Sequence, residues 1–431
     1  MTLAGLAKAA TGFAAAALLA VCITTKSPPP SPPAPSPVPP ASTQGATEFM
    51  FRDAAGKPLE FPLRDIRTPR HPESIALHEV TRLEPAPKGE SRLILLALDG
   101  PESLAVLSPP ENYANKGFVK SDQIGLLDDN GSFRPLGTTA HIQSDGLPRQ
   151  TYAGDVDDEW ATWIETSSTD LYQSNWRVFA QRRDGSGSPQ LLAAADEQRS
   201  ALTPRLPLLQ GDPRVRLSEG LAWWHTTYEQ PDGTFRTRVL AAPVEGGEAT
   251  PMLDLAAQPS PVTGGTVAIQ LAEATATNHT GPEEVEDWTP QTGLTLIDAS
   301  GTTRTLATFT ENYDADWFIR HLASDGDIVA LSINDGVLVL RTDGTPIAHL
   351  RVRTGTSERR VIDMGVCNGK VVFTPYVDLE GAESVVIYDA NKDALKTIQP
   401  EHAYADVYCS TERVAWTQSP DGSLVTTIAE W

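Results

Sequence analysis

Aromatic side chains interleaved with carboxylates are the feature of this sequence best suited to chemistry. They gather in four stretches, residues 165–176, 225–233, 273–290 and 311–317. An aromatic ring stacks on a sugar and attracts a cation, while a carboxylate hydrogen-bonds to hydroxyls and pairs with cations. The stretches therefore predict a surface that binds a glycan or a cationic peptide group. The candidate ligand-binding residues are Asp170, Tyr172, Trp176, His225, Tyr228, Glu283, Asp287, Trp288, Tyr313, Asp316 and Trp317.

Catalysis is the alternative use of the same carboxylates. Two acids about 5–10 Å apart could hydrolyse a glycosidic bond, and a cluster of acids could hold Ca²⁺. The sequence contains no G-x-S-x-G, H-E-x-x-H, P-loop or EF-hand motif, and its eight histidines are scattered singly. Non-catalytic binding is therefore the leading hypothesis, and an exported carbohydrate-active hydrolase or lyase is the alternative. No cofactor is expected other than Ca²⁺, and no residue is assigned as catalytic.

The three cysteines form two groups, one in the N-terminal segment and two near the C-terminus. Cys22 lies in the N-terminal segment, whereas Cys367 and Cys409 lie near the C-terminus, 42 residues apart. In an oxidising compartment an even pair predicts a disulfide. Neither cysteine has the Cys/His neighbours that a zinc site requires, so we predict no metal there.

The N-terminus predicts export. Lys8 precedes an uncharged apolar run over residues 9–25, which is typical of a secretory signal and is also just long enough for an uncleaved membrane anchor. The sequence around Cys22 resembles a bacterial lipobox, although Val21 replaces the small residue of that motif. Residues 27–42 then hold nine prolines, which predicts an extended tether. The expected domains are a signal or anchor over residues 1–26, a tether over 27–44 and one body over 45–431.

The charge of the chain restricts its partners. Its 34 basic and 56 acidic residues give a formal net charge of −22. Such a chain repels the phosphates of nucleic acids, and it also repels anionic lipid surfaces. We therefore expect a monomer that binds a protein or glycan of the cell envelope and touches the membrane only through its N-terminus.

A recurring short strand organises the body. It has a small or β-branched residue between larger ones, and a turn precedes it. Successive copies are 42, 43 or 46 residues apart in three cases and 61 or 62 apart in two, which is the period of four-stranded propeller blades with insertions. The six copies begin at Trp160, Leu221, Val267, Val329, Val371 and Val414.

A second recurring piece is an alternating strand that ends in an Asp or Gly turn, as at Asp128, Asp184, Asp298, Asp343 and Asp389. Together the two pieces predict an all-β propeller of about seven blades, with six as the alternative and a divergent first unit near residues 93–134. After Val414 the sequence offers too few strands for a last blade. We expect an N-terminal strand near Phe49 or Leu59 to complete it and close the ring.

Cys367 and Cys409 fit this register, because each lies four or five residues before its own recurring strand, at the end of an innermost strand. Innermost strands of neighbouring blades converge, so the two cysteines could approach to the ~5.5 Å between Cα atoms that a disulfide needs.

The segment 160–182, WATWIETSSTDLYQSNWRVFAQR, and the C-terminal Val414-Ala415-Trp416 with Ser419-Pro420-Asp421-Gly422 resemble the blades of TolB-like propellers, which occur in exported bacterial lipoproteins. The resemblance extends over most of residues 45–431 through short repeats. It implies the propeller fold and a binding role, and it brings no catalytic residues with it.

Overall fold

The computed structural model describes residues 51–67, 74–87, 89–114, 120–139, 146–167, 175–196, 214–229, 235–272, 290–309, 319–353, 360–376, 384–398, 403–419 and 423–431. The predicted signal, the tether and Cys22 lie outside these ranges. Phe49–Trp431 form one compact unit.

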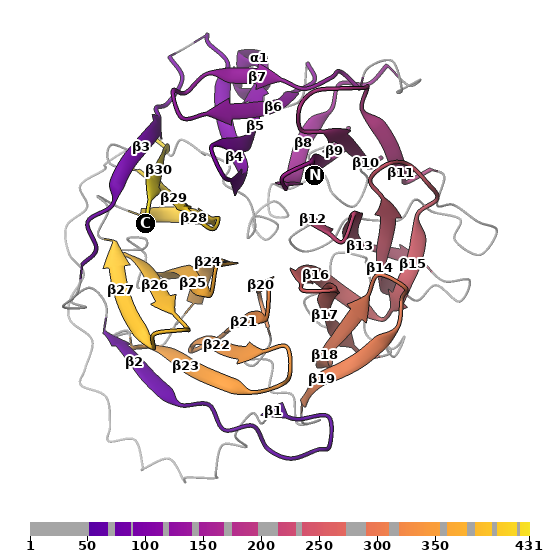
Figure 1. Ribbon diagram of the computed structural model, residues 1–431. Helices are drawn as coiled ribbons and strands as arrows, with labels where there is room; N and C mark the ends of the chain where they lie inside the picture. The colour runs from indigo at the N-terminus through magenta and orange to yellow at the C-terminus, as the bar shows by residue number, and fades with distance from the viewer. Residues whose placement is uncertain are drawn as a thin grey trace, which may run out of the picture. The chain divides into compact units, whose positions relative to one another are not determined.

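Seven antiparallel sheets of this unit stand around a common axis, as Figure 1 shows. Each sheet is a blade, so the described residues confirm the predicted seven-bladed propeller. We number the blades 1 to 7 in the order of their innermost strands. Those strands are β4 (Arg92–Asp99), β8 (Gln150–Val156), β12 (Val215–Ser218), β16 (Ala256–Val262), β20 (Leu322–Asp325), β24 (Arg360–Cys367) and β28 (Ala403–Cys409).

The other strands of each blade follow outward from the axis. The second strands are β5 (Glu102–Ser108), β9 (Trp160–Thr166), β13 (Leu221–Glu229), β17 (Gly265–Leu271), β21 (Ile328–Ile333), β25 (Lys370–Tyr376) and β29 (Arg413–Gln418). The third strands are β6 (Gln123–Asp128), β10 (Arg177–Arg182), β14 (Phe235–Pro243), β18 (Gln291–Asp298), β22 (Gly336–Arg341), β26 (Val385–Asp389) and β30 (Val425–Glu430). The fourth are β7 (Phe133–Pro135), β11 (Gln190–Ala194), β15 (Thr250–Asp254), β19 (Thr303–Phe309), β23 (Pro346–Arg353), β27 (Ala394–Ile398) and, in blade 7, β3 (His78–Leu83).

The recurring strand of the sequence is the second strand of each blade. Every residue of β9, β21 and β29 is buried. Alternate side chains of such a strand point to opposite faces of the sheet and therefore enter different seams between blades. Trp223 packs between blades 3 and 4, for example, while its neighbour Trp224 packs between blades 2 and 3. The recurring strand of blade 1, Leu104-Ala105-Val106 of β5, is not among the six copies identified in the sequence.

The core is divided among the seams. The described residues form seven hydrophobic clusters, and each cluster is shared mainly by two neighbouring blades. The propeller is thus held together by side chains between its sheets, where burial of apolar surface is the main favourable contribution.

Aspartates build several of the hairpins between third and fourth strands, as the sequence predicted. Asp128 Oδ1 accepts hydrogen bonds from the N–H groups of Asn130, at 2.9 Å, and Ser132, at 2.8 Å. Asp298 holds Ser300 and Thr302 in the same way, both at 2.9 Å. In each of these turns the Asp at the end of the third strand accepts backbone hydrogen bonds, and these stabilise the reversal of the chain.

The ring is closed by an N-terminal strand, but not by the one that we expected. The closing strand is β3, which pairs with β30 in blade 7. β1 (Phe51–Arg52) pairs instead with β19 in blade 4, and Leu59 folds back on it through a hydrogen bond from its N–H to the carbonyl of Phe51. The tight turn at Asp53 explains the error, because it makes residues 51–59 a small hairpin too short to complete a blade. β3 begins at His78.

β1 and β3 lie at the outside of the ring, and a third segment of the N-terminal part of the chain lies there too (Figure 1). β2 (Leu63–Arg67) adds a parallel fifth strand to β23 of blade 5, and Ser74 bridges Thr397 of blade 6. We call the described residues 51–67 and 74–83 the strap. It contacts blades 4, 5, 6 and 7 in succession.

The predicted disulfide is present between Cys367 and Cys409, with Cα atoms 5.9 Å apart. It joins the ends of innermost strands β24 and β28 and so ties blade 6 to blade 7. Helix α1 (Pro110–Ala114) is short, and no helix within the described ranges is long and apolar enough to cross a membrane.

Candidate functional site

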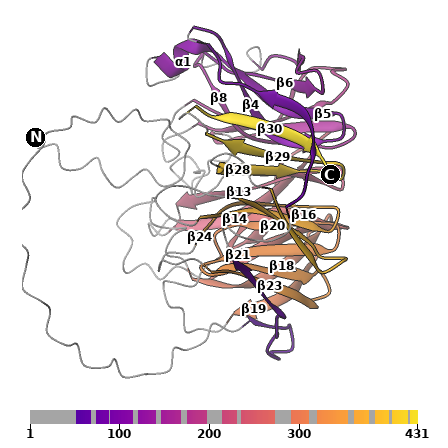
Figure 2. The same cartoon turned by 90° about the vertical axis from the view of Figure 1, so that its left-hand side faces the viewer.

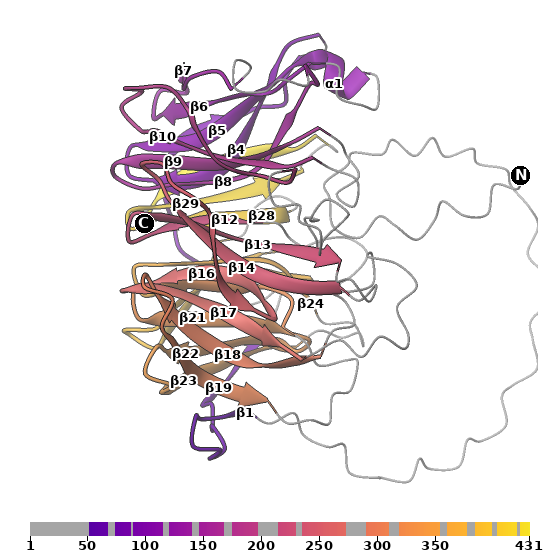
Figure 3. The ribbon, with the colours of Figure 1, turned by 90° about the vertical axis from the view of Figure 1, so that its right-hand side faces the viewer.

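Each blade has two ends, which the edge-on views of Figures 2 and 3 show. The first and second strands, and the third and fourth, join at one end, which we call the turn face. Second strands lead to third strands, and fourth strands lead to the next blade, at the opposite end, which we call the loop face. All four stretches predicted to bind a ligand start or end on strands that reach the loop face, in blades 2 to 5.

Most of the predicted ligand-binding residues lie outside the described ranges. These are Asp170, Tyr172, Glu283, Asp287, Trp288, Tyr313, Asp316 and Trp317. Their contribution to a site stays a prediction.

The other three predicted residues lie in the body of the blades. Trp176 is fully buried and packs edge-on against Trp224, with ring centroids 6.5 Å apart, so it supports the loop face from within and offers no surface for stacking. His225 and Tyr228 belong to β13, which continues to Glu229 where we expected a loop. Both side chains are buried, and the guanidinium of Arg238 lies 4.4 Å from the centre of the Tyr228 ring.

Three charged or titratable side chains that we did not predict meet at the loop-face side of the axis. Arg214 precedes β12 in blade 3, His321 precedes β20 in blade 5, and Asp363 lies in β24 of blade 6. Nη2 of Arg214 lies 3.4 Å from Nδ1 of His321 and donates to Oδ1 of Asp363 at 3.3 Å. We call these three residues the axial cluster.

Hydrogen bonds to the backbone fix the axial cluster in place. Asp363 Oδ2 accepts the N–H of Val407 in blade 7 at 3.0 Å. The His321 N–H donates to Oγ of Ser332 at 2.8 Å, and the Ser332 N–H donates to the His321 carbonyl at 2.9 Å. The cluster thus joins four blades, and its Arg and Asp side chains are 15 % and 19 % exposed. It combines a cation, an imidazole and a carboxylate at the loop-face side of the axis.

Other buried acids near the loop face serve the structure. Asp122 accepts hydrogen bonds from Ser108 Oγ at 2.6 Å and from the N–H of Thr151 at 3.0 Å, and so joins blade 1 to blade 2. Burial raises the pKa of Asp122, and these hydrogen bonds partly oppose the rise. Glu165 accepts from Thr139 at 3.0 Å and from the indole of Trp163 at 2.9 Å. Across the described ranges, no group of three or more His, Cys, Asp or Glu side chains is placed to hold a metal ion.

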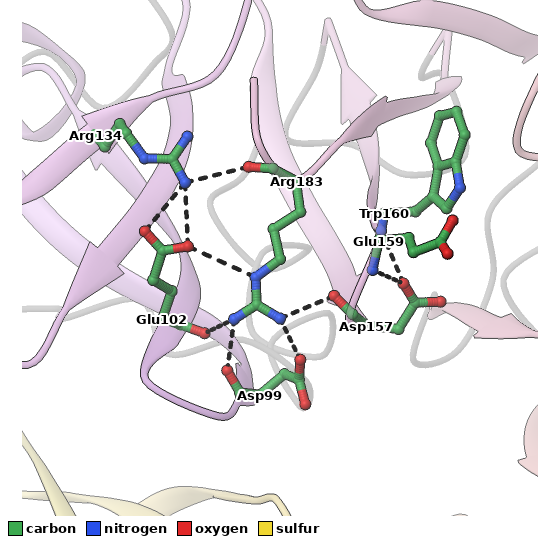
Figure 4. A network of polar contacts seen from close by, with 7 residues as sticks. All are labelled: Asp99, Glu102, Arg134, Asp157, Glu159, Trp160 and Arg183. Atoms are coloured by element: carbon green, nitrogen blue, oxygen red, sulfur yellow. Dashed lines mark hydrogen bonds and ion pairs between the residues drawn. The ribbon is translucent and has the colours of Figure 1, made fainter. Parts of the chain in front are cut away.

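A second charged network lies on the turn face, between blades 1 and 2 (Figure 4). Arg183 donates to the carboxylate and the carbonyl of Asp99 and to the carbonyl of Glu102. Arg134 in turn binds the Glu102 carboxylate at 3.0 Å. Burial raises the pKa of Asp99, while Arg183 opposes the rise. This network fastens two blades to each other.

The axial cluster has only a weak signal in the sequence. Its members are isolated in the chain, and 107 and 149 residues separate Arg214 from its two partners. The one usable signal is the position of these residues in the chain, since each lies in or directly before an innermost strand.

No protein-family model and no curated protein matches the chain. Among solved structures, the acylaminoacyl peptidase of Pyrococcus horikoshii matches with a TM-score of 0.49 and 9% identity, over 80% of this chain and 52% of its own. The present chain thus spans about half the length of that peptidase.

Two further structures are smaller than that peptidase and match over most of their length. The β-propeller domain of the Trilobed protease from Pyrococcus furiosus has a TM-score of 0.48 and 11% identity, over 79% of this chain and 95% of its own. An α-L-arabinanase of Penicillium chrysogenum has a TM-score of 0.38 and 10% identity, over 82% and 98%. With TM-scores below 0.5, these similarities establish neither the fold nor the activity of the present chain.

Proposed function

We propose that this protein is an exported, TolB-like propeller of the cell envelope that binds a protein or glycan partner through its loop face and catalyses no reaction. The axial cluster is the observation that carries the binding role. Arg214, His321 and Asp363 come from three blades and meet at the axis on the side where the predicted ligand-binding stretches begin. Convergent polar groups at one end of a rigid scaffold are the usual basis of a binding site.

Export is supported by the disulfide together with the signal-like N-terminus. Disulfides persist in oxidising compartments, and Cys367 and Cys409 are joined by a disulfide. Cell fractionation tests this part of the proposal. We expect the protein in the membrane fraction with Cys22 intact and in the soluble exported fraction after Cys22→Ala. Recovery of the wild-type protein with reduced cysteines in the cytoplasm would contradict it.

A retention assay tests the binding role. The purified full chain is immobilised, and envelope extract is passed over it as separate protein and polysaccharide fractions. Two loop-face variants are compared with wild type, Arg214→Gln with His321→Gln, and Trp288→Ala with Trp317→Ala. We expect each double variant to lose about tenfold or more of the retained component, which corresponds to ~1.4 kcal/mol.

The matched control is Glu248→Gln with Glu412→Gln, two exposed acids on turns of the opposite face. It should retain the component as wild type does. Unchanged retention by both loop-face variants would exclude the loop face as the site. Release of new reducing ends from the polysaccharide would show the hydrolase alternative instead.

A further inference from the structure

A cavity opens on the turn face at the seam between blades 2 and 3. Its volume is about 470 Å³, within the range of small-ligand pockets. The turn between β8 and β9 supplies Asp158, Glu159 and Trp160, and the end of β14 with the following turn supplies Pro243, Val244 and Glu245. The cavity therefore combines one aromatic and two apolar residues with a carboxylate rim.

Trp160 contributes a polar group, its indole N–H, to the lining of this cavity. Its side chain lines the space although the residue is only 7 % exposed. Among the described residues, none accepts a hydrogen bond from its indole N–H, whereas the Trp163, Trp223 and Trp431 indoles each donate to a protein oxygen. An indole N–H that has no acceptor among the described residues would be satisfied by an acceptor on a ligand in the cavity.

The contacts of Arg182 indicate that the cavity favours a positively charged ligand. The guanidinium of Arg182 lies 4.8 Å from the centre of the Trp160 ring. The same guanidinium lies 3.7 Å from Glu159 and 3.5 Å from Glu245, and its side chain is 44 % exposed. Long contacts and high exposure make this a weakly held internal cation.

The carboxylates around the cavity have different roles. Asp157 accepts hydrogen bonds from the N–H groups of Glu159, at 2.9 Å, and Trp160, at 2.8 Å, and so shapes the turn, as Figure 4 shows. Asp158, Glu159 and Glu245 are exposed at the rim. The described residues that line the cavity include no Lys or Arg. Three carboxylates thus surround an aromatic ring, and a ligand cation would displace Arg182 from two of them.

We propose that this cavity binds a basic peptide segment of a partner protein. A guanidinium or ammonium group enters between Glu159, Glu245 and Asp158, against the Trp160 ring and in place of Arg182. A peptide carbonyl beside that side chain accepts the free indole N–H. The net charge of −22 favours a basic partner over an acidic one. The site lies on the turn face and is independent of the proposed loop-face function.

Fluorescence polarisation with a labelled Gly-Arg-Gly-Arg-Gly peptide tests the proposal, and its citrulline analogue serves as the neutral probe. We expect the arginine peptide to bind and the citrulline peptide to bind about tenfold more weakly or not at all. The variant Asp158→Asn with Glu159→Gln and Glu245→Gln should weaken binding about tenfold. The matched control, Glu79→Gln with Glu248→Gln and Glu412→Gln, removes three exposed charges elsewhere and should bind as wild type.

Two single changes examine the individual contacts. Trp160→Phe keeps the ring and removes the N–H, so binding should weaken about threefold or more. Arg182→Gln removes the internal cation, so binding should strengthen by a similar factor. Equal weakening by both triple variants, equal binding of the two peptides, or no binding by wild type would each overturn the proposal. Weaker binding by Arg182→Gln would contradict the replacement of Arg182 by the ligand.

Discussion

The rim of the propeller has a strapped half and a bare half. In blades 4 to 7 the strap adds β1, β2, the Ser74 bridge and β3 to the outer edge of successive blades. In blades 1 to 3 the outermost strands, β7, β11 and β15, pair with no further strand among the described residues. A free strand edge invites pairing with another chain, so both halves have to protect their edges.

The bare edges are protected locally. β7 has three residues and ends in Pro135, β15 has five and contains Pro251, and Pro189 directly precedes the five-residue β11. Proline lacks an N–H donor, and a short strand offers few unpaired groups. The strapped edges β19 and β23 are longer, with seven and eight residues. The two longest of these edges, β19 and β23, thus have a strand partner, whereas the bare edges are short and have proline in or next to the strand.

The strapped half also contains the disulfide, and its removal should have the largest effect. Replacement of both Cys367 and Cys409 by Ser opens a closed loop with a sequence separation of 42 residues. We expect the free energy of unfolding to fall by about 4 kcal/mol. Urea unfolding of the variant measures this, and wild type treated with reductant should match it. Equal midpoints for variant and oxidised wild type would show that the bond contributes nothing to the closure of blades 6 and 7.

Loss of a fully buried apolar contact of the strap comes next. Ile66 of β2 is completely buried in the cluster between blades 5 and 6. Ile66→Ala should cost about 3 kcal/mol and speed hydrogen exchange in β23. Ile94 in blade 1 is 37% exposed, so Ile94→Ala is the matched change in the bare half and should cost less than about 1 kcal/mol. Similar costs for the two variants would remove the energetic distinction between the halves.

The bare half should have its own pH dependence through Asp155. This residue of β8 accepts the Leu217 N–H at 2.9 Å and joins blades 2 and 3. Burial raises the pKa of Asp155, and Arg216 opposes the rise. The folded state therefore favours the protonated acid, so its unfavourable contribution develops as pH rises from the ordinary aspartate range through the raised pKa.

Asp155→Asn keeps the acceptor and removes the charge. Its stability should therefore equal that of wild type at acid pH and exceed it increasingly toward neutral pH. Urea midpoints at several pH values between about 4 and 8 measure the difference. A constant difference in urea midpoint across this range would show that the pKa of Asp155 is the same in the folded and unfolded states.

The smallest effect should come from an ion pair at the surface of the strap. Arg64 of β2 binds Asp393 in the turn before β27, and both side chains are about half exposed. The pair lowers the pKa of Asp393 chiefly through the hydrogen bond from Arg64. Its contribution is therefore present at neutral pH and lost as pH falls through the lowered pKa.

Arg64→Gln should cost less than about 1 kcal/mol at low salt and almost nothing at high salt. Thermal unfolding at the two salt concentrations tests this. A large cost that persists in high salt would mean that the strap depends on Arg64 more than on Ile66.

Much of the fold could be predicted because its signals are local. Ala161 between large residues, Asp128 at a strand end and Cys367 before a recurring strand each mark a place within one blade. The closing strand could not be predicted in the same way. β3 and the hairpin at Phe51 both have strand-forming sequences, and only their fit to particular blade edges distinguishes them.

The candidate site was predicted less completely. The sequence identified the loop face through its long stretches of aromatic and acidic residues. It placed Trp176 on that face, yet the Trp176 indole is buried against Trp224. Burial depends on the neighbouring blade, which the local sequence does not contain.

By itself, the sequence determined the repeat, the approximate blade number and the cysteine pair, because each depends on residue types at short or regular spacing. Only the tertiary structure decided that Arg214, His321 and Asp363 meet, that Trp160 lines a cavity between two blades, and that the strap covers half of the rim. These contacts join residues far apart in the chain, and the curvature of the ring sets which of them come together.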